Sequence, residues 1–280
     1  MSGPPMRRRR NPKCLVCCPP RVVVGIAGRP GSGKSTAVAV IADRVRERMR
    51  HYQVQACLPP QCGTAEGLGK GVEVQVMPMD GYHLYRRELK AMPDPKRAFE
   101  RRGAEWTFNP GRLRDDLTAI KYASTRVRKT IVDQSGTRRE VQVLVRPAVS
   151  VPSFDHAAGD PLESAITIQP KTGIVLVEGN YLLYQEKPTW AAVSGLFDLR
   201  VFLQCPREVC LERLIRRHCK AWGITREEAA VRAGGSDMKN GDLVETTSVN
   251  AQFLLHSINV DSLDEKKEEH GAQKKTTSKL

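Results

Sequence analysis

A nine-residue run near the amino terminus constrains this chain more than any other feature. Residues 28–36 read Gly-Arg-Pro-Gly-Ser-Gly-Lys-Ser-Thr and fit the phosphate-loop pattern of glycine, four residues, then Gly-Lys-Ser. Glycines in such a loop let successive backbone N–H groups point inward around phosphate oxygens. Lys34 can reach the β- and γ-phosphates, and the Ser35 hydroxyl can bind Mg²⁺. The pattern predicts a nucleoside triphosphate site with contacts from Gly28, Arg29, Pro30, Gly31, Ser32, Gly33, Lys34, Ser35 and Thr36.

The flanking sequence favours a strand, the loop and then a helix. Residues 21–27 form an apolar run that is typical of a buried strand. The helix expected after the loop carries apolar side chains on one face: Val38, Ile41, Ala42, Val45 and Met49. Phosphate would then lie at the positive amino terminus of this helix. We expect Lys34 to face solvent when no nucleotide is bound. A chance match without nucleotide binding is the alternative.

Strand and helix patterns alternate along residues 21–258, which predicts one α/β domain with a P-loop NTPase fold. We expect a parallel sheet flanked by helices, with a lid and a small β-hairpin as additions. The expected elements are strands at 72–77, 173–178 and 199–203, a hairpin at 126–145, and helices after the Asn109-Pro110 cap, at 206–219 and at the 225–228 capping box. Residues 59–71 are typical of a long loop. Residues 1–20 and 259–280 are expected to be disordered tails.

Composition limits the class of protein. The chain has 280 residues, 40% of them hydrophobic, which is enough for one substantial core. Its formal net charge of +14 raises nucleic acid as a partner, but six basic residues lie within positions 1–21, and aromatic residues make up only 5%. Eight cysteines without a secretory signal indicate reduced thiols, and no apolar run is long enough to span a membrane. We therefore expect neither a nucleic-acid partner nor a membrane span.

Two carboxylates follow predicted strands, where α/β enzymes place functional groups. Glu178 ends the strand at 173–178 and fits the acid that holds Mg²⁺ directly or through water. Asp80 follows the strand at 72–77 and can accept the proton of a substrate hydroxyl; a surface or helix-capping carboxylate is the alternative. Arg213, Arg216 and Arg217 lie on one predicted helix. They can form a lid that stabilises developing charge, or ordinary surface salt bridges.

Residues 86–114 form a second basic cluster, with nine basic and four acidic side chains. A phosphorylated or otherwise anionic acceptor would explain the excess, because arginine forms charge-assisted hydrogen bonds with such groups. The cluster includes Arg101, Arg102 and Arg112, of which we assign Arg112 to the acceptor site. A solvated basic surface is the alternative interpretation.

The order of several motifs resembles the uridine kinase, phosphoribulokinase and pantothenate kinase superfamily over residues 21–258. These motifs are the phosphate loop, residues 79–83 (Met-Asp-Gly-Tyr-His), residues 152–156 (Pro-Ser-Phe-Asp-His), residues 177–181 (Val-Glu-Gly-Asn-Tyr) and the helix at 213–218. The resemblance implies that Asp80 is the catalytic base, that Arg216 and Arg217 belong to the lid, and that Phe154, Asp155 and His156 lie beside the acceptor. Tyr82 and His83, next to Asp80, are assigned to the same side. Residues 86–104 are similar to a branch whose members are called kinases or simply ATPases.

The sequence therefore predicts an ATP-dependent kinase that uses Mg²⁺ and phosphorylates a hydroxyl of a small, anionic metabolite. One alternative is an ATPase or nucleotide switch that acts on a macromolecule, and a second is an RNA-associated protein that uses the basic tail. The guanine-binding motif Asn-Lys-x-Asp of GTPases and the Leu-Ser-Gly-Gly signature of transporter ATPases are absent from the sequence.

The last three residues, Ser278, Lys279 and Leu280, match the tripeptide that the peroxisomal import receptor binds. They follow a polar stretch, which would leave them accessible. We expect a peroxisome or a peroxisome-like organelle such as the glycosome, with this receptor as a partner. The arginine-rich amino terminus suggests a mitochondrion instead, but its prolines disfavour an amphipathic helix. The cytoplasm, with an accidental tripeptide, is the other alternative.

Overall fold

A computed structural model describes residues 21–51, 73–132, 135–155 and 157–258. The two predicted tails, the loop at 59–71, His156 and the carboxyl-terminal tripeptide lie outside the described residues. The predictions made for them stay predictions.

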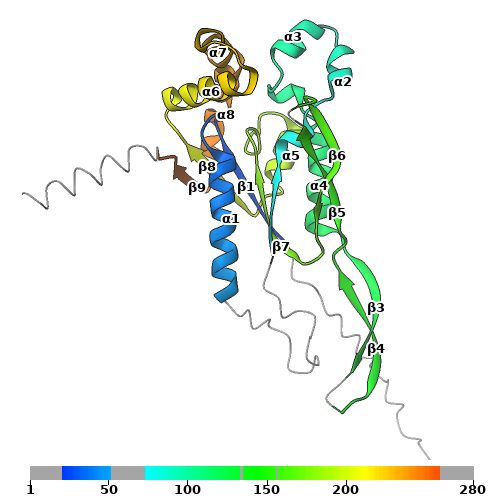
Figure 1. The fold of residues 1–280 in the computed structure, drawn as a ribbon. Helices are drawn as coiled ribbons and strands as arrows, with labels where there is room; N and C mark the ends of the chain where they lie inside the picture. Colours follow the sequence, from blue (N-terminus) through cyan, green and yellow to red (C-terminus); the bar gives the residue numbers. More distant parts are fainter. Residues whose placement is uncertain (1–20, 52–72, 133–134, 156, 259–280) are drawn as a thin grey trace, which may run out of the picture.

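A five-stranded parallel sheet in the order β2-β7-β1-β8-β9 forms the centre of the structure (Figure 1). Its strands are β1 (Val22–Gly28), β2 (Glu73–Pro78), β7 (Thr172–Glu178), β8 (Leu199–Gln204) and β9 (Phe253–His256). Because all pairs are parallel, the carboxyl ends of the strands lie along one edge. The sheet confirms the predicted fold class, and β9 is a strand that the sequence analysis missed.

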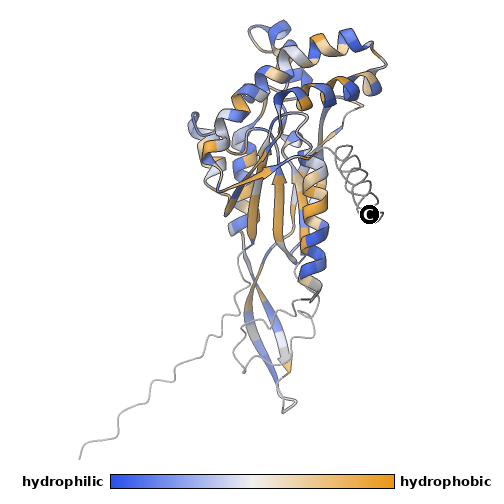
Figure 2. Ribbon diagram, turned by 90° about the vertical axis from the view of Figure 1, so that its left-hand side faces the viewer, coloured by the Kyte–Doolittle hydropathy of each residue, from blue (hydrophilic) through white to orange (hydrophobic). Residues whose placement is uncertain are grey.

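Helices cover both faces of the sheet, and alternate strand residues pack against them. On one face, Ile26 and Leu176 pack with Val38 and Ala42 of α1 (Lys34–His51). On the other face, Val23 and Val175 belong to the cluster that includes residues of α4 (Pro110–Tyr122) and α5 (Pro188–Ser194). Burial on both faces explains why these strands read as continuous apolar runs, which Figure 2 shows as orange strands at the centre. Asn109 caps α4 as predicted, because its side chain accepts a hydrogen bond from Arg112 N.

Two antiparallel hairpins lie outside the main sheet. The predicted hairpin pairs β3 (Thr125–Val132) with β4 (Arg138–Val145) and projects from the end of the sheet opposite to its carboxyl edge (Figures 1 and 2). A second hairpin, of β5 (Val149–Asp155) and β6 (Asp160–Ile168), was not predicted. It packs so tightly on the short helix η1 (Met79–Tyr82) that a Cβ at Gly81 would clash with the Pro152 carbonyl.

Two groups of short helices rise above the carboxyl edge of the sheet (Figure 1). One group contains α2 (Arg86–Lys90), α3 (Pro95–Glu100) and the single turn η2 (Glu105–Thr107). The other contains α6 (Arg207–Trp222), α7 (Arg226–Arg232), a π-helical turn (Ala233–Asp237), α8 (Met238–Thr246) and η4 (Thr247–Asn250). The capping box predicted at 225–228 is present at the start of α7. None of the described helices has the length and apolar character needed to span a membrane.

Candidate active site

The phosphate loop connects β1 to α1 at the carboxyl edge of the sheet. Gly31 and Gly33 have φ values of 80° and 90°, a region that residues with a Cβ rarely adopt. A Cβ at Gly31 would also lie 2.5 Å from the Cys210 carbonyl oxygen of α6. The loop therefore requires glycine both for its backbone turn and for its close approach to α6.

Lys34 is buried, so the prediction that it faces solvent without nucleotide is wrong. The residue is only 8% exposed, and its Nζ donates to the carbonyl oxygens of Gly28 at 2.8 Å and Arg29 at 2.9 Å. Burial lowers the pKa of the Lys34 ammonium, while Glu178 and Asp80 act against that shift. Two backbone carbonyls of the loop thus satisfy the buried ammonium.

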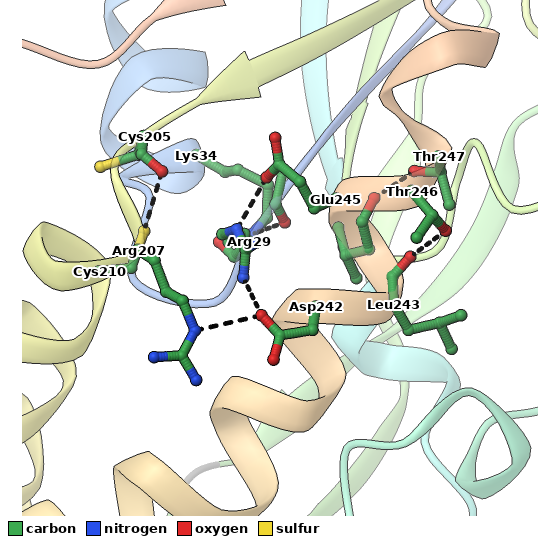
Figure 3. Close-up of polar contacts among 12 residues, drawn as sticks. Arg29, Lys34, Cys205, Arg207, Cys210, Asp242, Leu243, Glu245, Thr246 and Thr247 are labelled. Carbon is green, nitrogen blue, oxygen red and sulfur yellow. Dashed lines mark hydrogen bonds and ion pairs between the residues drawn. The ribbon is translucent and has the colours of Figure 1, made fainter.

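The side chain of Arg29 reaches α8 (Figure 3). Its Nη1 donates to Asp242 Oδ1 and its Nε to Glu245 Oε2, both at 2.7 Å. Arg207 of α6 shares Asp242 at 3.3 Å. We predicted that Arg29 contacts the nucleotide. Its guanidinium is bound by two carboxylates of α8. The sequence carries no signal for this contact, because 213 residues separate Arg29 from Asp242.

Glu178 and Asp80 lie next to the phosphate loop, Glu178 at the end of β7 and Asp80 in η1, directly after the neighbouring strand β2. Glu178 ends β7 and pairs in register with Pro78, two residues before Asp80. The Ser35 hydroxyl donates to Glu178 Oε1 at 3.0 Å. Burial raises the pKa of Glu178, an effect that nearby Lys34 opposes. The structure therefore brings together four of the predicted site residues: Lys34, Ser35, Asp80 and Glu178.

The donor set formed by Ser35 and Glu178 fits Mg²⁺. A hydroxyl and a carboxylate already in hydrogen-bond contact supply the hard oxygen ligands that Mg²⁺ prefers. Mg²⁺ bound at phosphates usually takes one or two protein oxygens together with waters and phosphate oxygens. Among the described residues, no group of three or more His, Cys, Asp or Glu side chains is arranged to hold a metal ion.

The predicted acceptor residues divide between an aromatic cluster and the core. His83 lies against Phe108 and Phe154, with ring centroids 4.0 and 4.8 Å apart, and its Nδ1 contacts the Asp80 carbonyl at 2.8 Å. Asp155 accepts hydrogen bonds from the next turn, from Ala157 N and Ala158 N. Its carboxylate thus stabilises the end of β5.

Tyr82, by contrast, is packed in the core. It is 1% exposed, and its hydroxyl donates to Asp116 Oδ2 at 2.8 Å. Burial, together with Asp116, raises the pKa of the phenol far above its ordinary value. The structure does not bring Tyr82 to the surface of the site.

The three arginines predicted as a lid have different contacts on α6. Arg213 contacts the phosphate loop, with Nη1 donating to Ser32 O at 3.2 Å and to Ser257 Oγ at 3.0 Å. Arg216 is exposed and paired with Glu212 at 2.9 Å. Arg217 is exposed and close enough to Lys34 to lower its pKa. The structure thus brings Arg213 and Arg217 to the nucleotide side and leaves Arg216 on an exposed ion pair.

A phosphate loop, two carboxylates at the carboxyl edge of a parallel sheet and the arginines of α6 above that edge define a P-loop phosphotransferase. A protein of Schizosaccharomyces pombe named "Putative uridine kinase C227.14" is 34% identical over 240 residues, which cover 85% of this chain and 84% of that protein. The "ATP-dependent kinase-like protein notR'" of Aspergillus versicolor is 36% identical over 186 residues, 63% of this chain and 92% of that protein.

A solved structure leads to the same class. The crystal structure of a "putative fructose transport system kinase" from Silicibacter sp. TM1040 superposes with a TM-score of 0.62 and 25% identity, covering 85% of this chain and 90% of that one. No protein-family model matches the chain. The chain belongs to the family of ATP-dependent P-loop kinases that contains the two fungal proteins, which agrees with the resemblance to uridine kinases in the sequence.

Proposed function

We propose that this kinase transfers the γ-phosphate of ATP to a hydroxyl of a small, anionic metabolite, with Mg²⁺ as cofactor. The observation that carries the proposal is the convergence of Lys34, the Ser35–Glu178 pair and Asp80 at the carboxyl ends of β1, β7 and β2. Phosphoryl transfer needs a cation at the phosphates, a metal site and a group that accepts the proton of the acceptor hydroxyl. This edge of the sheet supplies a residue for each.

Each residue has a role that its position supports. Lys34 exchanges its two carbonyl partners for the β- and γ-phosphates when nucleotide binds. Ser35 and Glu178 hold Mg²⁺, which neutralises charge on the phosphates when bound. Asp80 accepts the proton of the acceptor hydroxyl. Arg217, exposed and near Lys34, is the lid residue best placed to approach the transferred group.

The test is a screen for acceptor-dependent release of ADP, using sugars, sugar phosphates, nucleosides, hydroxy acids and vitamins. We expect at least one acceptor to raise ADP release and to appear as its phosphate ester by mass spectrometry. The Asp80→Asn variant should bind MgATP with unchanged affinity in calorimetry, yet lose at least about 100-fold in turnover of that acceptor.

Asp115→Asn is the matched control, because Asp115 is an exposed carboxylate whose one ion-pair partner among the described residues is its neighbour Arg114. It should keep full activity. Normal turnover by Asp80→Asn would remove Asp80 as the base. ATP hydrolysis that no small molecule stimulates, but that rises with added RNA or protein, would overturn the kinase proposal.

A further inference from the structure

Three arginines of the acceptor side differ in how many of their donors are used within the protein. Arg112 is bound through two guanidinium nitrogens to Glu163. Arg102 contacts Asp160 and the carbonyl oxygens of Gly159 and Leu84, and its guanidinium lies over the Phe154 ring. Both side chains hold β6 against the helices of this side, and both terminal guanidinium nitrogens of each are bonded within the chain; in Arg102 the buried donor without a partner among the described residues is Nε, which is next to the side-chain stem.

Arg101 differs from these two arginines because one of its terminal guanidinium nitrogens has no partner among the described residues. Its Nη2 donates to Asn240 Oδ1 at 2.8 Å, whereas its Nη1 is buried and has no hydrogen-bond partner among the described residues. Asn240 is itself 3% exposed and belongs to α8. A buried cationic donor without a partner is unfavourable, so its position calls for an acceptor oxygen that a ligand can supply.

The position of this donor connects the two sides of the site. Asn240 precedes Gly241 and Asp242, the part of α8 that contacts Arg29 of the phosphate loop. Two residues after Arg101, the Gly103 carbonyl accepts a hydrogen bond of 2.8 Å from the hydroxyl of Tyr181, which lies three residues beyond Glu178 at the end of β7. The Arg101–Asn240 contact therefore lies at the same edge of the sheet as the predicted metal site and base.

No carboxylate among the described residues forms an ion pair with Arg101, whose one side-chain hydrogen-bond partner there is Asn240. Asp237 contacts His218 Nε2 at 2.7 Å, and Glu105 pairs with Lys187 at 2.7 Å. Ser236 Oγ is another of the buried polar atoms without a partner among the described residues, and it lies four residues before Asn240, about one helical turn away.

We infer that Arg101 binds an anionic group of the acceptor, a carboxylate or a phosphate, through Nη1 while Asn240 holds the guanidinium in place. This inference rests on the proposed function and names the residue that would select an anionic acceptor. The reacting hydroxyl lies at Asp80, and the anionic group is a separate part of the same molecule. Arg102 and Arg112 have structural roles in this arrangement.

The test compares Arg101→Gln with Arg97→Gln. Arg97 is an exposed arginine on α3, four residues earlier, so its variant loses the same charge from the same segment. Matched acceptor pairs that differ by one anionic group, D-glycerate with glycerol and pantothenate with pantothenol, are assayed beside the best acceptor of the screen. We expect the anionic member to be preferred, and Arg101→Gln to raise its KM about tenfold or more while the KM for ATP stays within about twofold. Arg101→Lys should recover part of this loss, and Arg97→Gln should behave as the wild type.

If no acceptor turns over, anion binding by Arg101 can be tested directly. The protein is saturated with MgADP, and its thermal denaturation is followed with added inorganic phosphate or acetate, one for each anion class. Stabilisation that Arg97→Gln keeps and Arg101→Gln loses supports the inference. Equal responses of the two variants overturn it, as does a neutral acceptor whose KM Arg101→Gln leaves unchanged. In that last case the kinase proposal survives, since Asp80→Asn still abolishes turnover.

Discussion

Two cations that contact the phosphate loop and two cations on the acceptor side of the site are held by different groups. Lys34 and Arg213 donate to backbone carbonyls of the phosphate loop. Across the site, Arg112 and Arg102 are paired with the carboxylates of Glu163 and Asp160. Carbonyl dipoles neutralise a cation only partly, so phosphate can displace them, whereas a paired carboxylate competes fully with a ligand. Excess charge in a sequence therefore does not show which charge is available to a ligand.

The largest loss of activity should come from replacing Lys34, whose ammonium is held by two backbone carbonyls. Lys34→Met keeps the aliphatic volume of this buried side chain and removes its charge. We expect the fold to persist and acceptor-dependent turnover to fall about 100-fold or more, because the γ-phosphate loses its nearest cation. Circular dichroism and steady-state kinetics test this. A folded Lys34→Met protein with normal turnover would contradict the assignment of the phosphate loop.

The next largest effect should come from the carboxylate at the end of β7. Glu178→Gln keeps the hydrogen bond to Ser35 but loses the negative charge that attracts Mg²⁺. We expect activity to fall about 10- to 100-fold and to need a higher Mg²⁺ concentration for half-saturation. A Mg²⁺ titration of turnover measures both quantities. Glu208→Gln, an exposed site in the first turn of α6, is the control and should not change the titration. Identical Mg²⁺ curves for Glu178→Gln and wild type would remove Glu178 from the metal site.

A smaller effect is expected for Arg29, the nucleotide-side cation that two carboxylates bind. Arg29→Ala removes two charge-assisted hydrogen bonds between the phosphate loop and α8, which should lower the free energy of unfolding by about 1.5–3 kcal/mol and raise the KM for ATP. Arg207→Ala loses only an exposed 3.3 Å contact with the same Asp242 and should change stability by less than about 1 kcal/mol. Urea unfolding and ATP kinetics compare them. Equal stability losses in the two variants would show that Arg29 does not hold the loop. If Arg29→Ala does not fold, Arg29→Lys, which keeps the charge, replaces it in the comparison.

The smallest effect concerns the exposed pair on the acceptor side. Arg112 and Tyr85 lower the pKa of Glu163 from 4.5 to about 2. Because the folded-state pKa lies below the unfolded-state value, the pair stabilises the protein above about pH 4.5 and loses this contribution as the pH falls towards 2. Half of the Glu163 side chain is exposed, so the contribution at pH 7 is below about 1 kcal/mol. The stability difference between wild type and Glu163→Gln should shrink between pH 6 and pH 3 in urea unfolding. Glu100→Gln, on the exposed face of α3, should show no such change, and a difference that is constant with pH would contradict the role of this pair.

Sequence patterns predicted most of the framework because they depend on neighbouring residues. The apolar runs of β1 and β7, the Asn109-Pro110 cap and the 225–228 capping box are local, and each is present. Positions of Ser35, Asp80 and Glu178 followed from the rule that parallel strands end at one edge. The hairpin of β5 and β6 was missed because Pro152 interrupts the strand pattern of β5, and the edge strand β9 was missed because it has only 4 residues, which pair with β8.

The amino-acid sequence by itself determined the phosphate loop, the order of strands and helices, and the kind of chemistry that they serve. Only the tertiary structure decided which charged side chains remain available to bind a ligand. Arg29 pairs with a residue 213 positions away and Arg101 with one 139 positions away. Such contacts depend on how the whole chain is routed, since an ion pair forms wherever folding brings opposite charges together. The local pattern therefore predicts where phosphate binds, and the path of the chain selects the arginine that is left to meet a second anion.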